Sequence, residues 1–333
     1  MIRNIKTIMR QDREPYRIPR RVQDVIPIQC VWPDGIFKVG IKFSKTYRFT
    51  DINYKVAGQE DKETMFRVYS ELLNSLDCAA TTKLTICNRR QSQADFEQSV
   101  LMPMREDGLD KYRREYNQML MDKATGANGI TQEKYITITV YKRDIEDARA
   151  YFTRIGADLT ARFAALGSKC VELDATDRLR ILHDFYRAGD EGNFHFDMAG
   201  KGHDFRDYIC PDGIEKHSDY LKLGDRYCRV LFLKDYANYI QDEIVTNLTD
   251  LDRNMMLSID ILNVPTDEAV REVENRLLGV ETNITNWQRR QNQNNNFSAI
   301  VPYDMELQRR ESKEFLADLT TRDQRMMQAV LTL

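Results

Sequence analysis

The order of secondary-structure elements constrains the fold of this chain more than any other feature of its sequence. Short runs that alternate apolar and polar residues predict β-strands, and longer runs with apolar residues at helical spacing predict helices. The two kinds of run follow one another along most of the chain. The clearest strand is KYITITVY at residues 134–141, and the helix after it spans residues 144–166, with Gly167 as a stop signal.

The predicted elements repeat the order β-α-β-α-β, which suggests an internal duplication. Because the strands are amphipathic rather than wholly apolar, they favour an α+β fold of two successive mixed units, each with a sheet covered mainly on one face. The first half predicts a β-meander at 24–54, helices at 60–77 and 109–123, and a strand at 82–88 before the strand at 134–141. The second half predicts a helix at 175–186, a hairpin at Gly224 and Asp225, strands at 226–236, 255–264 and 325–333, and helices at 239–248, 266–291 and 304–320.

These elements predict four consecutive parts. They are a basic flexible arm at residues 1–23, a first α/β unit at 24–170, a helical and irregular connector at 171–218, and a second α/β unit at 219–333. The final run, RMMQAVLTL, is apolar and β-prone up to the last residue, a pattern that we expect where a longer protein is truncated. No stretch approaches the roughly 18 uninterrupted apolar residues of a membrane-spanning helix, so we expect a chain that does not cross a bilayer by itself.

Composition and charge exclude some classes of protein. With 42% hydrophobic and 30% charged residues, the chain is not disordered throughout, and its net charge of −3 gives no overall attraction to nucleic acid. Residues 1–21 differ, because seven basic residues there face two acidic ones. Arg17, Arg20 and Arg21 of this arm are candidates for contact with an anionic membrane surface or an acidic partner, and the alternative is a solvated tail. The six scattered cysteines form no CxxC pair, which indicates reduced thiols in a cytoplasmic protein.

The sequence contains none of the short motifs that carry common enzyme chemistry. It has no GxxxxGK[ST] phosphate loop, no GxGxxG and no GxSxG, so we assign no catalytic and no cofactor-binding residue. The irregular stretch at 189–218 collects several metal-ligand residue types, but their spacing is wider than that of structural zinc sites. A surface loop is therefore favoured over a metal site, and no metal ligand is assigned from His195, Asp197, His203, Cys210 and His217.

Four pairs of arginines offer a second functional hypothesis. A nucleic-acid-binding module could use these pairs for phosphates and Trp287 and Tyr112 for base stacking. Neighbouring acidic residues such as Glu115, Glu306 and Glu311 favour ion-paired helix faces instead. The pairs are Arg89 and Arg90, Arg113 and Arg114, Arg289 and Arg290, and Arg309 and Arg310. Met119 and Met121 are interpreted as core residues.

The run WQRRQNQNNNF, at residues 287–297, lies between two long predicted helices. It is too poor in apolar groups to bury much surface, so residues 288–296 are predicted to form a solvated junction. A contact with a neighbouring subunit is the alternative.

Long runs of the chain resemble the N-terminal half of conjugal-transfer ATPases, the large TraC/TraE-type ATPases of type IV secretion systems in integrative and conjugative elements. The resemblance extends from about residue 24 to the end of the chain. The runs are WPDGIFKVGIKFSKTYRFTDINY at 32–54, YSELLNSLD at 69–77, DGLDKYRREYN at 107–117, LGSKCVELDA at 166–175, RLRILHDFYR at 178–187 and NMMLSIDILNVPTDEAVREVENRLLGVETNITNWQRRQNQNNNFSAIVPYDME at 254–306.

The resemblance implies an N-terminal α/β docking region followed by a RecA-like domain that binds ATP and Mg²⁺ through Walker motifs. This chain matches the first part and lacks a Walker A motif, so we expect no ATP hydrolysis from it alone. The implied function is docking and assembly during DNA transfer, at the cytoplasmic face of the inner membrane. The implied partners are membrane components of the secretion channel and further subunits of a hexamer. Besides Arg17, Arg20 and Arg21 of the arm, the candidate contact residues are Trp32, Phe37, Trp287, Arg289 and Arg290.

Overall fold

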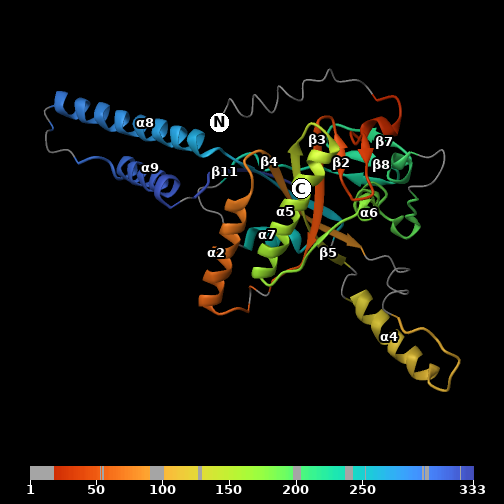
Figure 1. Cartoon of the computed structure of the whole chain (residues 1–333). Helices are drawn as coiled ribbons and strands as arrows, with labels where there is room; N and C mark the ends of the chain where they lie inside the picture. The colour runs from red at the N-terminus through yellow and green to blue at the C-terminus, as the bar shows by residue number, and fades with distance from the viewer. Residues whose placement is uncertain are drawn as a thin grey trace. The chain divides into compact units, whose positions relative to one another are not determined.

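The computed structural model describes residues 19–52, 54, 56–90, 101–126, 130–197, 204–236, 243–251, 253–294, 296, 300–322 and 324–333. It contains long helices and a large antiparallel sheet (Figure 1), which confirms the predicted α+β class. In the described ranges, no helix combines the length and the apolar character that crossing a membrane requires.

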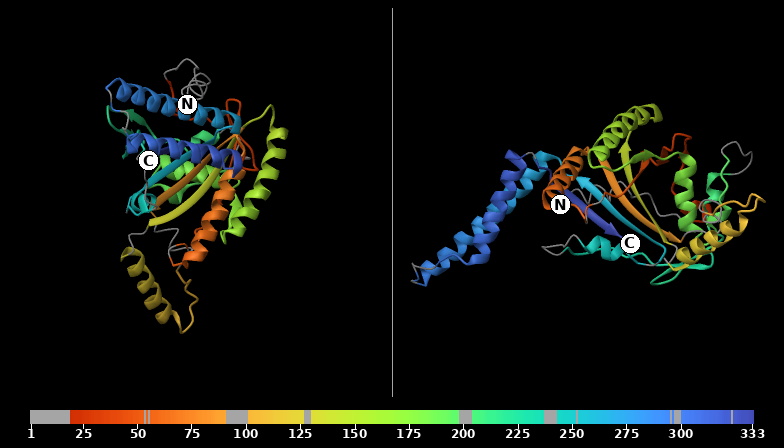
Figure 2. Two further views of the ribbon diagram at one scale, coloured as in Figure 1. Left: turned by 90° about the vertical axis from the view of Figure 1, so that its left-hand side faces the viewer. Right: turned by 90° about the horizontal axis from the view of Figure 1, so that it is seen from below.

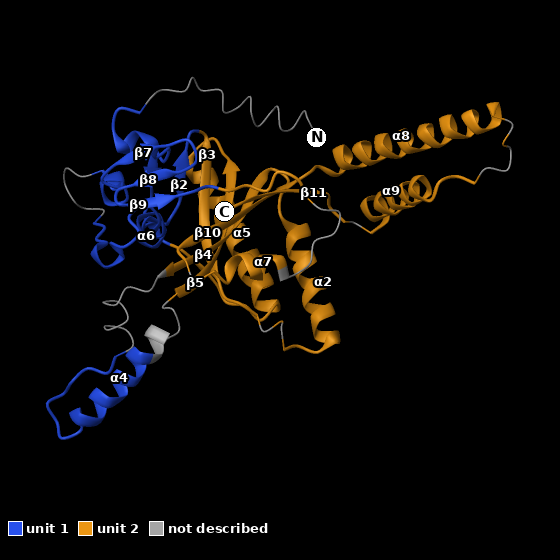
Figure 3. Cartoon of the chain, turned by 180° about the vertical axis from the view of Figure 1, so that it is seen from behind, with its two compact units in different colours: residues 1–40, 91–127, 174–230 blue, residues 41–90, 128–173, 231–333 orange. Residues whose placement is uncertain are grey.

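The chain forms two compact units, each assembled from three separate stretches of sequence (Figure 3). Unit 1 contains residues 1–40, 91–127 and 174–230, and unit 2 contains residues 41–90, 128–173 and 231–333. The units are therefore interleaved along the chain, whereas the sequence predicted consecutive parts. The difference arises because strands far apart in the sequence pair with one another, and local periodicity carries no information about such pairing.

The sheet of unit 2 takes strands from both halves of the sequence. Strand β4 pairs with β5 along its full length, with Leu84 opposite Ile136, and every neighbouring pair is antiparallel. The order is β3-β5-β4-β10-β11, so β10 and β11 extend the sheet of the first half instead of building a duplicate of it. The bounds are Lys42–Phe49 for β3, Ala80–Arg90 for β4, Ile130–Tyr141 for β5, Met255–Asn263 for β10 and Met327–Thr332 for β11, and the short β6, Cys170–Glu172, pairs with β3.

Helices α2, Gln59–Ser75, and α5, Ile145–Ala165, cover one face of this sheet (Figures 1 and 2). Helix α5 begins where the Asp144 side chain accepts a hydrogen bond from the Asp147 amide at 2.9 Å, and the chain leaves it through Gly167 at a φ of 79°. The apolar stripe of α5 is buried against the sheet. Its buried residues are Ala148, Tyr151, Phe152, Ile155, Gly156, Leu159 and Phe163.

Helices α8, Thr266–Gln293, and α9, Tyr303–Thr321, form an antiparallel hairpin in unit 2 (Figure 2). Val273 of α8 and Leu319 of α9 are buried in their shared apolar cluster. The amide-rich run starts inside α8, because the helix continues to Gln293 before Asn294 caps it. Residues 288–293 are thus a helix end that is exposed except at the half-buried Gln291, and the junction itself starts at residue 294. A shorter helix, α7, spans Glu243–Thr249.

Unit 1 has a separate core around Leu179 and Ile209, which are fully buried. Arg178 supports this core, since its guanidinium lies 3.8 Å from the centre of the Phe37 ring and donates a hydrogen bond to the Gly35 carbonyl at 2.7 Å. The elements are η1 Val22–Val25, β1 Cys30–Val31, β2 Phe37–Val39, α4 Asp110–Gly126, α6 Ala175–Tyr186, η2 Glu191–Asn193, η3 Phe205–Tyr208 and the antiparallel strands β7 Ile214–Lys216, β8 Leu221–Leu223 and β9 Arg226–Cys228.

The strand predicted at 226–236 is divided between two partners. β9 ends at Cys228 after pairing with β8, and Phe232 then forms a bridge with Thr332 beside β11. The whole run is β-prone, but its two parts hydrogen-bond to different strands, so one continuous strand does not form.

Candidate protein-interaction site on helix α4

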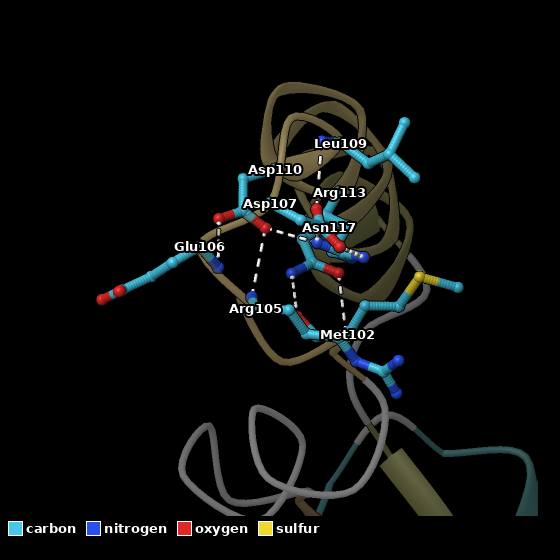
Figure 4. Close-up of polar contacts among 8 residues, drawn as sticks. All are labelled: Met102, Arg105, Glu106, Asp107, Leu109, Asp110, Arg113 and Asn117. Carbon is cyan, nitrogen blue, oxygen red and sulfur yellow. Dashed lines mark hydrogen bonds and ion pairs between the residues drawn. The ribbon is translucent and has the colours of Figure 1, made fainter.

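The loop at residues 101–109 is held against the first turns of α4 by side chains of the helix (Figure 4). Asn117 is buried and uses both ends of its amide: its Oδ1 accepts from the Met102 N–H and its Nδ2 donates to the Met102 carbonyl, each at 2.9 Å. This pairing imitates the hydrogen bonds of a β-ladder. It therefore fixes the Met102 backbone relative to the helix.

Arg113 ties the turn before α4 to the helix (Figure 4). Its two Nη atoms reach both carboxylate oxygens of Asp107 at 2.5 and 2.6 Å, and Nη1 also lies 2.5 Å from Oδ1 of Asp110. A guanidinium that binds a carboxylate through two parallel hydrogen bonds has a defined orientation as well as a favourable charge. One arginine thus orders both carboxylates of the turn.

Asp110 in turn anchors the backbone of the loop. Its carboxylate accepts from the Arg105 amide at 3.2 Å and from the Glu106 amide at 2.9 Å. Glu106 has a φ of 56°, a left-handed conformation that is unfavourable for a residue with a side chain. The hydrogen bond from its amide helps to hold that conformation, so the loop has a definite shape.

These contacts shift the titration of the groups involved. The pKa of Asp107 lies below its usual value mainly because Arg113 donates to its carboxylate, and the pKa of Asp110 is lowered by the Arg105 amide first and by Arg113 next. The pKa of Arg113 is raised by the same two carboxylates. All three groups are therefore charged at neutral pH, and the clamp is intact there.

The face of α4 beside this loop carries an exposed apolar stripe. Leu109, immediately before α4, and Tyr112, Tyr116 and Met119 of α4 follow one another at intervals of three, four and three residues. They therefore lie on one side of the helix. Tyr112 is 65% exposed and Leu109 57%. We call these four residues the α4 stripe. Met102 and Met104 of the loop are exposed as well.

A stripe of this kind normally faces a core or a partner. The described polar residues of α4 carry both charge signs, with Asp110, Glu115 and Asp122 against Lys111, Arg113 and Arg114. A helix that lies on an anionic membrane is usually dominated by basic residues on its polar face. The mixed charge of α4 therefore fits a protein surface better than a lipid surface.

The predicted contact residues of unit 1 have different environments. Arg17 lies outside the described residues, whereas Arg20 and Arg21 are exposed and their amides donate to the Asp24 carboxylate. Trp32 is half-buried. Phe37 is only 3% exposed and packs under Arg178, so its side chain belongs to the core and not to a contact surface. Its alternating sequence context predicted a strand but not which face would be covered.

The predicted contact residues of unit 2 lie near the end of α8. Trp287 is half-buried, and Arg289 and Arg290 are exposed. They share the helix end that precedes Asn294.

Three of the arginines proposed to contact phosphates are paired with carboxylates instead. Arg113 holds Asp107 and Asp110, Arg89 lies 3.4 Å from Glu133, and Arg309 lies 2.6 Å from Glu306. These contacts agree with the interpretation of the arginine pairs as ion-paired surfaces. They leave less basic charge for a nucleic acid than the sequence alone suggests.

The stretch at 189–218 brings together no group of three metal-ligating side chains within the ranges described, and His203 lies outside those ranges. Cys210 is buried, and burial raises the pKa of its thiol. His217 stacks on Tyr220 with ring centres 4.3 Å apart.

The described residues of each unit line a hollow. The hollow of unit 1, about 560 Å³, is lined by charged groups that are already paired, such as Arg187 with Asp190 at 3.1 Å and with Asp212 at 3.3 Å. The hollow of unit 2, about 240 Å³, lies between α2, α5, α7 and the sheet and is mostly apolar, with Leu72, Phe163 and Leu257 in its lining. Neither lining places a nucleophile beside a general base.

Sequence reasoning identified helix α4 but not its exposed apolar stripe. Tyr112 was considered as a stacking residue, Arg113 as a phosphate contact and Met119 as a core residue. The signal available was the regular spacing of Leu109, Tyr112, Tyr116 and Met119, which predicts an apolar stripe without saying whether the rest of the chain covers it.

No family model matches the chain, and no curated protein matches it.

Proposed function

We propose that this chain is a non-catalytic docking and assembly module, and that the α4 stripe binds a protein partner. The observation that carries the proposal is an apolar stripe exposed on a helix whose adjoining loop is fixed by Arg113 and Asn117. A pre-ordered surface loses little conformational entropy on binding, so the buried apolar area contributes more fully to affinity. Tyr112 and Tyr116 suit this role because tyrosine supplies a large, rigid contact area.

The resemblance to conjugal-transfer ATPases supplies the identity of the proposed partner. In that setting the α4 stripe contacts inner-membrane proteins of the secretion channel, and the basic arm with Arg17, Arg20 and Arg21 lies at the membrane surface. The chain would position a motor domain without hydrolysing ATP itself, because its sequence contains no phosphate loop. Further subunits of a homo-oligomer, a hexamer by the same resemblance, complete the set of proposed partners.

Sedimentation with membrane vesicles tests the proposal. Vesicles from cells that make the conjugation channel are compared with vesicles from cells that lack it. The double variant Tyr112→Ser/Tyr116→Ser removes two aromatic contacts, and we expect its binding to channel-bearing vesicles to fall by about thirtyfold, as for the loss of interface hot spots. The control variant Lys111→Ser/Gln118→Ser changes the opposite face of the same helix and should bind as the unmodified chain does.

Equal binding of the two double variants would remove the α4 stripe from the proposal. Equal binding to vesicles with and without the channel would show a lipid contact in place of the proposed protein contact. Circular dichroism of each variant checks that α4 remains helical.

A further inference from the structure

In the described part of unit 2, residues 231–233 pair with β11 on the side of that strand away from β10, at one edge of the sheet. Leu231 and Leu333 exchange two backbone hydrogen bonds of 2.7 and 2.8 Å, and the Leu233 amide donates to the Leu331 carbonyl at 3.0 Å. Phe232 bridges Thr332 between them. In such an antiparallel pair, Leu231 and Leu233 direct their backbone groups toward β11, so the N–H and C=O of Phe232 point away from it.

The hydroxyl of Tyr236 stabilises this arrangement. It donates to the Ala329 carbonyl at 3.0 Å and accepts from the Leu331 amide at 3.1 Å. The segment after Phe232 is therefore attached to β11 at a second point. We call residues 230–234 the edge segment.

The first four residues of the edge segment are apolar and exposed, and the fifth is Lys234. Phe232 is 70% exposed and Val230 60%, and Leu231 and Leu233 beside them are exposed too. Natural edge strands usually carry charges, proline or a bulge that prevent further pairing. Four consecutive apolar residues at an edge instead favour the addition of another strand.

The sequence around Phe232 is complementary to itself. If two copies pair antiparallel about a two-fold axis through Phe232, residues at equal distances on either side of it face each other. Phe232 then lies opposite Phe232 and Leu231 opposite Leu233. Val230 of one copy lies opposite Lys234 of the other, and Arg229 lies opposite Asp235. An oppositely charged pair therefore forms at each end of the paired segments.

Arg229 already contacts Asp219, with Nη2 2.8 Å from Oδ2. This contact is exposed, and a guanidinium has five N–H donors, so Arg229 can hold a second carboxylate as well. The Phe232 N–H and C=O, which point outward, would supply two hydrogen bonds across the axis.

We infer that two copies of this chain associate by pairing their edge segments antiparallel, which joins the two unit 2 sheets into one continuous sheet. The residues involved are separate from the α4 stripe. Failure of this inference therefore leaves the proposed docking through the α4 stripe intact, and the reverse also holds.

Sedimentation equilibrium of the full chain at several concentrations tests the inference. We expect a reversible dimer. Phe232→Lys places two like charges opposite each other, so the dissociation constant should rise by about tenfold or more. Leu278→Lys is the matched control, because Leu278 is a similarly exposed apolar residue of α8, and it should leave the dissociation constant unchanged.

Charge reversal tests the antiparallel register. Arg229→Asp and Asp235→Arg should each weaken the dimer, since each places like charges opposite each other, and the double variant should restore it. Because these side chains are exposed, the fold should tolerate each change. A chain that stays monomeric at every concentration, or a dimer indifferent to Phe232→Lys, would overturn the inference. A dimer that Phe232→Lys weakens but the double charge reversal does not restore would overturn the register.

Discussion

Helices α4 and α5 are both amphipathic, yet only α5 has its apolar stripe covered. Phe152 and Leu159 of α5 are fully buried against the sheet of unit 2, whereas Tyr112 and Tyr116 of α4 are exposed. The side chains of α4 are engaged through polar contacts instead. Arg113 and Asn117 hold the preceding loop through side-chain hydrogen bonds. The comparison indicates that the stripe of α5 stabilises the fold and that the stripe of α4 is available for binding.

The largest difference between the two helices should appear in the free energy of unfolding when one apolar side chain of each stripe is replaced by alanine. Leu159→Ala removes a fully buried side chain and should lower the free energy of unfolding by about 3 kcal/mol, through lost burial and a residual cavity. Tyr112→Ala should change it by less than about 0.5 kcal/mol, as for most exposed positions. Urea unfolding followed by circular dichroism measures both. A large loss for Tyr112→Ala would mean that the α4 stripe contributes to the fold.

One glycine in α5 and one in α8 test how closely α5 packs on the sheet. A Cβ on Gly156 would lie 3.0 Å from the hydroxyl oxygen of the buried Tyr47 and closer still to Glu172, so Gly156→Ala should destabilise the chain by about 1–3 kcal/mol. Gly279 of α8 has open space around it. There the same change should stabilise by up to about 1 kcal/mol, because alanine is the better helix former. Thermal and urea unfolding give the two signs, and a stabilising Gly156→Ala would contradict the close packing of α5.

Removal of the Asn117 amide tests the loop before α4. Asn117→Ala leaves the Met102 backbone groups without their partner, at a local cost of about 1–3 kcal/mol. Hydrogen exchange of residues 101–106 should accelerate accordingly. The matched change Gln118→Ala removes only an exposed hydrogen bond to Asp122 and should leave that exchange unaltered. Equal exchange in the two variants would show that Asn117 does not hold the loop.

The smallest expected effect is the pH dependence of the contacts between Arg113 and the two carboxylates before it. The pKa values of Asp107 and Asp110 are lowered in the folded chain. Their contacts with Arg113 therefore stabilise the loop fully at pH values above the pKa of an unfolded aspartate, about 3.9. That stabilisation is lost as the pH falls through the lowered values. Carboxyl carbon NMR should show both groups titrating below their usual range, and Arg113→Gln should raise both pKa values. Unchanged titration in Arg113→Gln would argue against the clamp.

Local pattern predicted much of the secondary structure and little of the long-range pairing. The spacing of apolar residues placed α6 at its observed bounds, Ala175–Tyr186, and placed β10 within one residue. It missed β6, because three residues are too few for a periodicity and the strand exists only through its pairing with β3. The interleaved units were missed for the same reason.

The candidate site was predictable only in part. The sequence indicated a helix with Tyr112 and Met119 on it, but whether an apolar stripe is covered depends on distant parts of the chain. The partners of Arg113 lie three and six residues before it, and a carboxylate at either distance is too common to identify a clamp. Phe37 shows the opposite case, in which a residue assigned to a surface is buried beneath Arg178.

Hydrogen exchange of the full chain, with and without vesicles that carry the conjugation channel, would show whether the α4 stripe binds the channel. If the α4 stripe is the docking surface, the amides of residues 109–119 should exchange more slowly with channel-bearing vesicles than in the free chain. With vesicles that lack the channel they should exchange at the rate of the free chain. Binding that leaves the exchange of these residues unchanged would contradict the account.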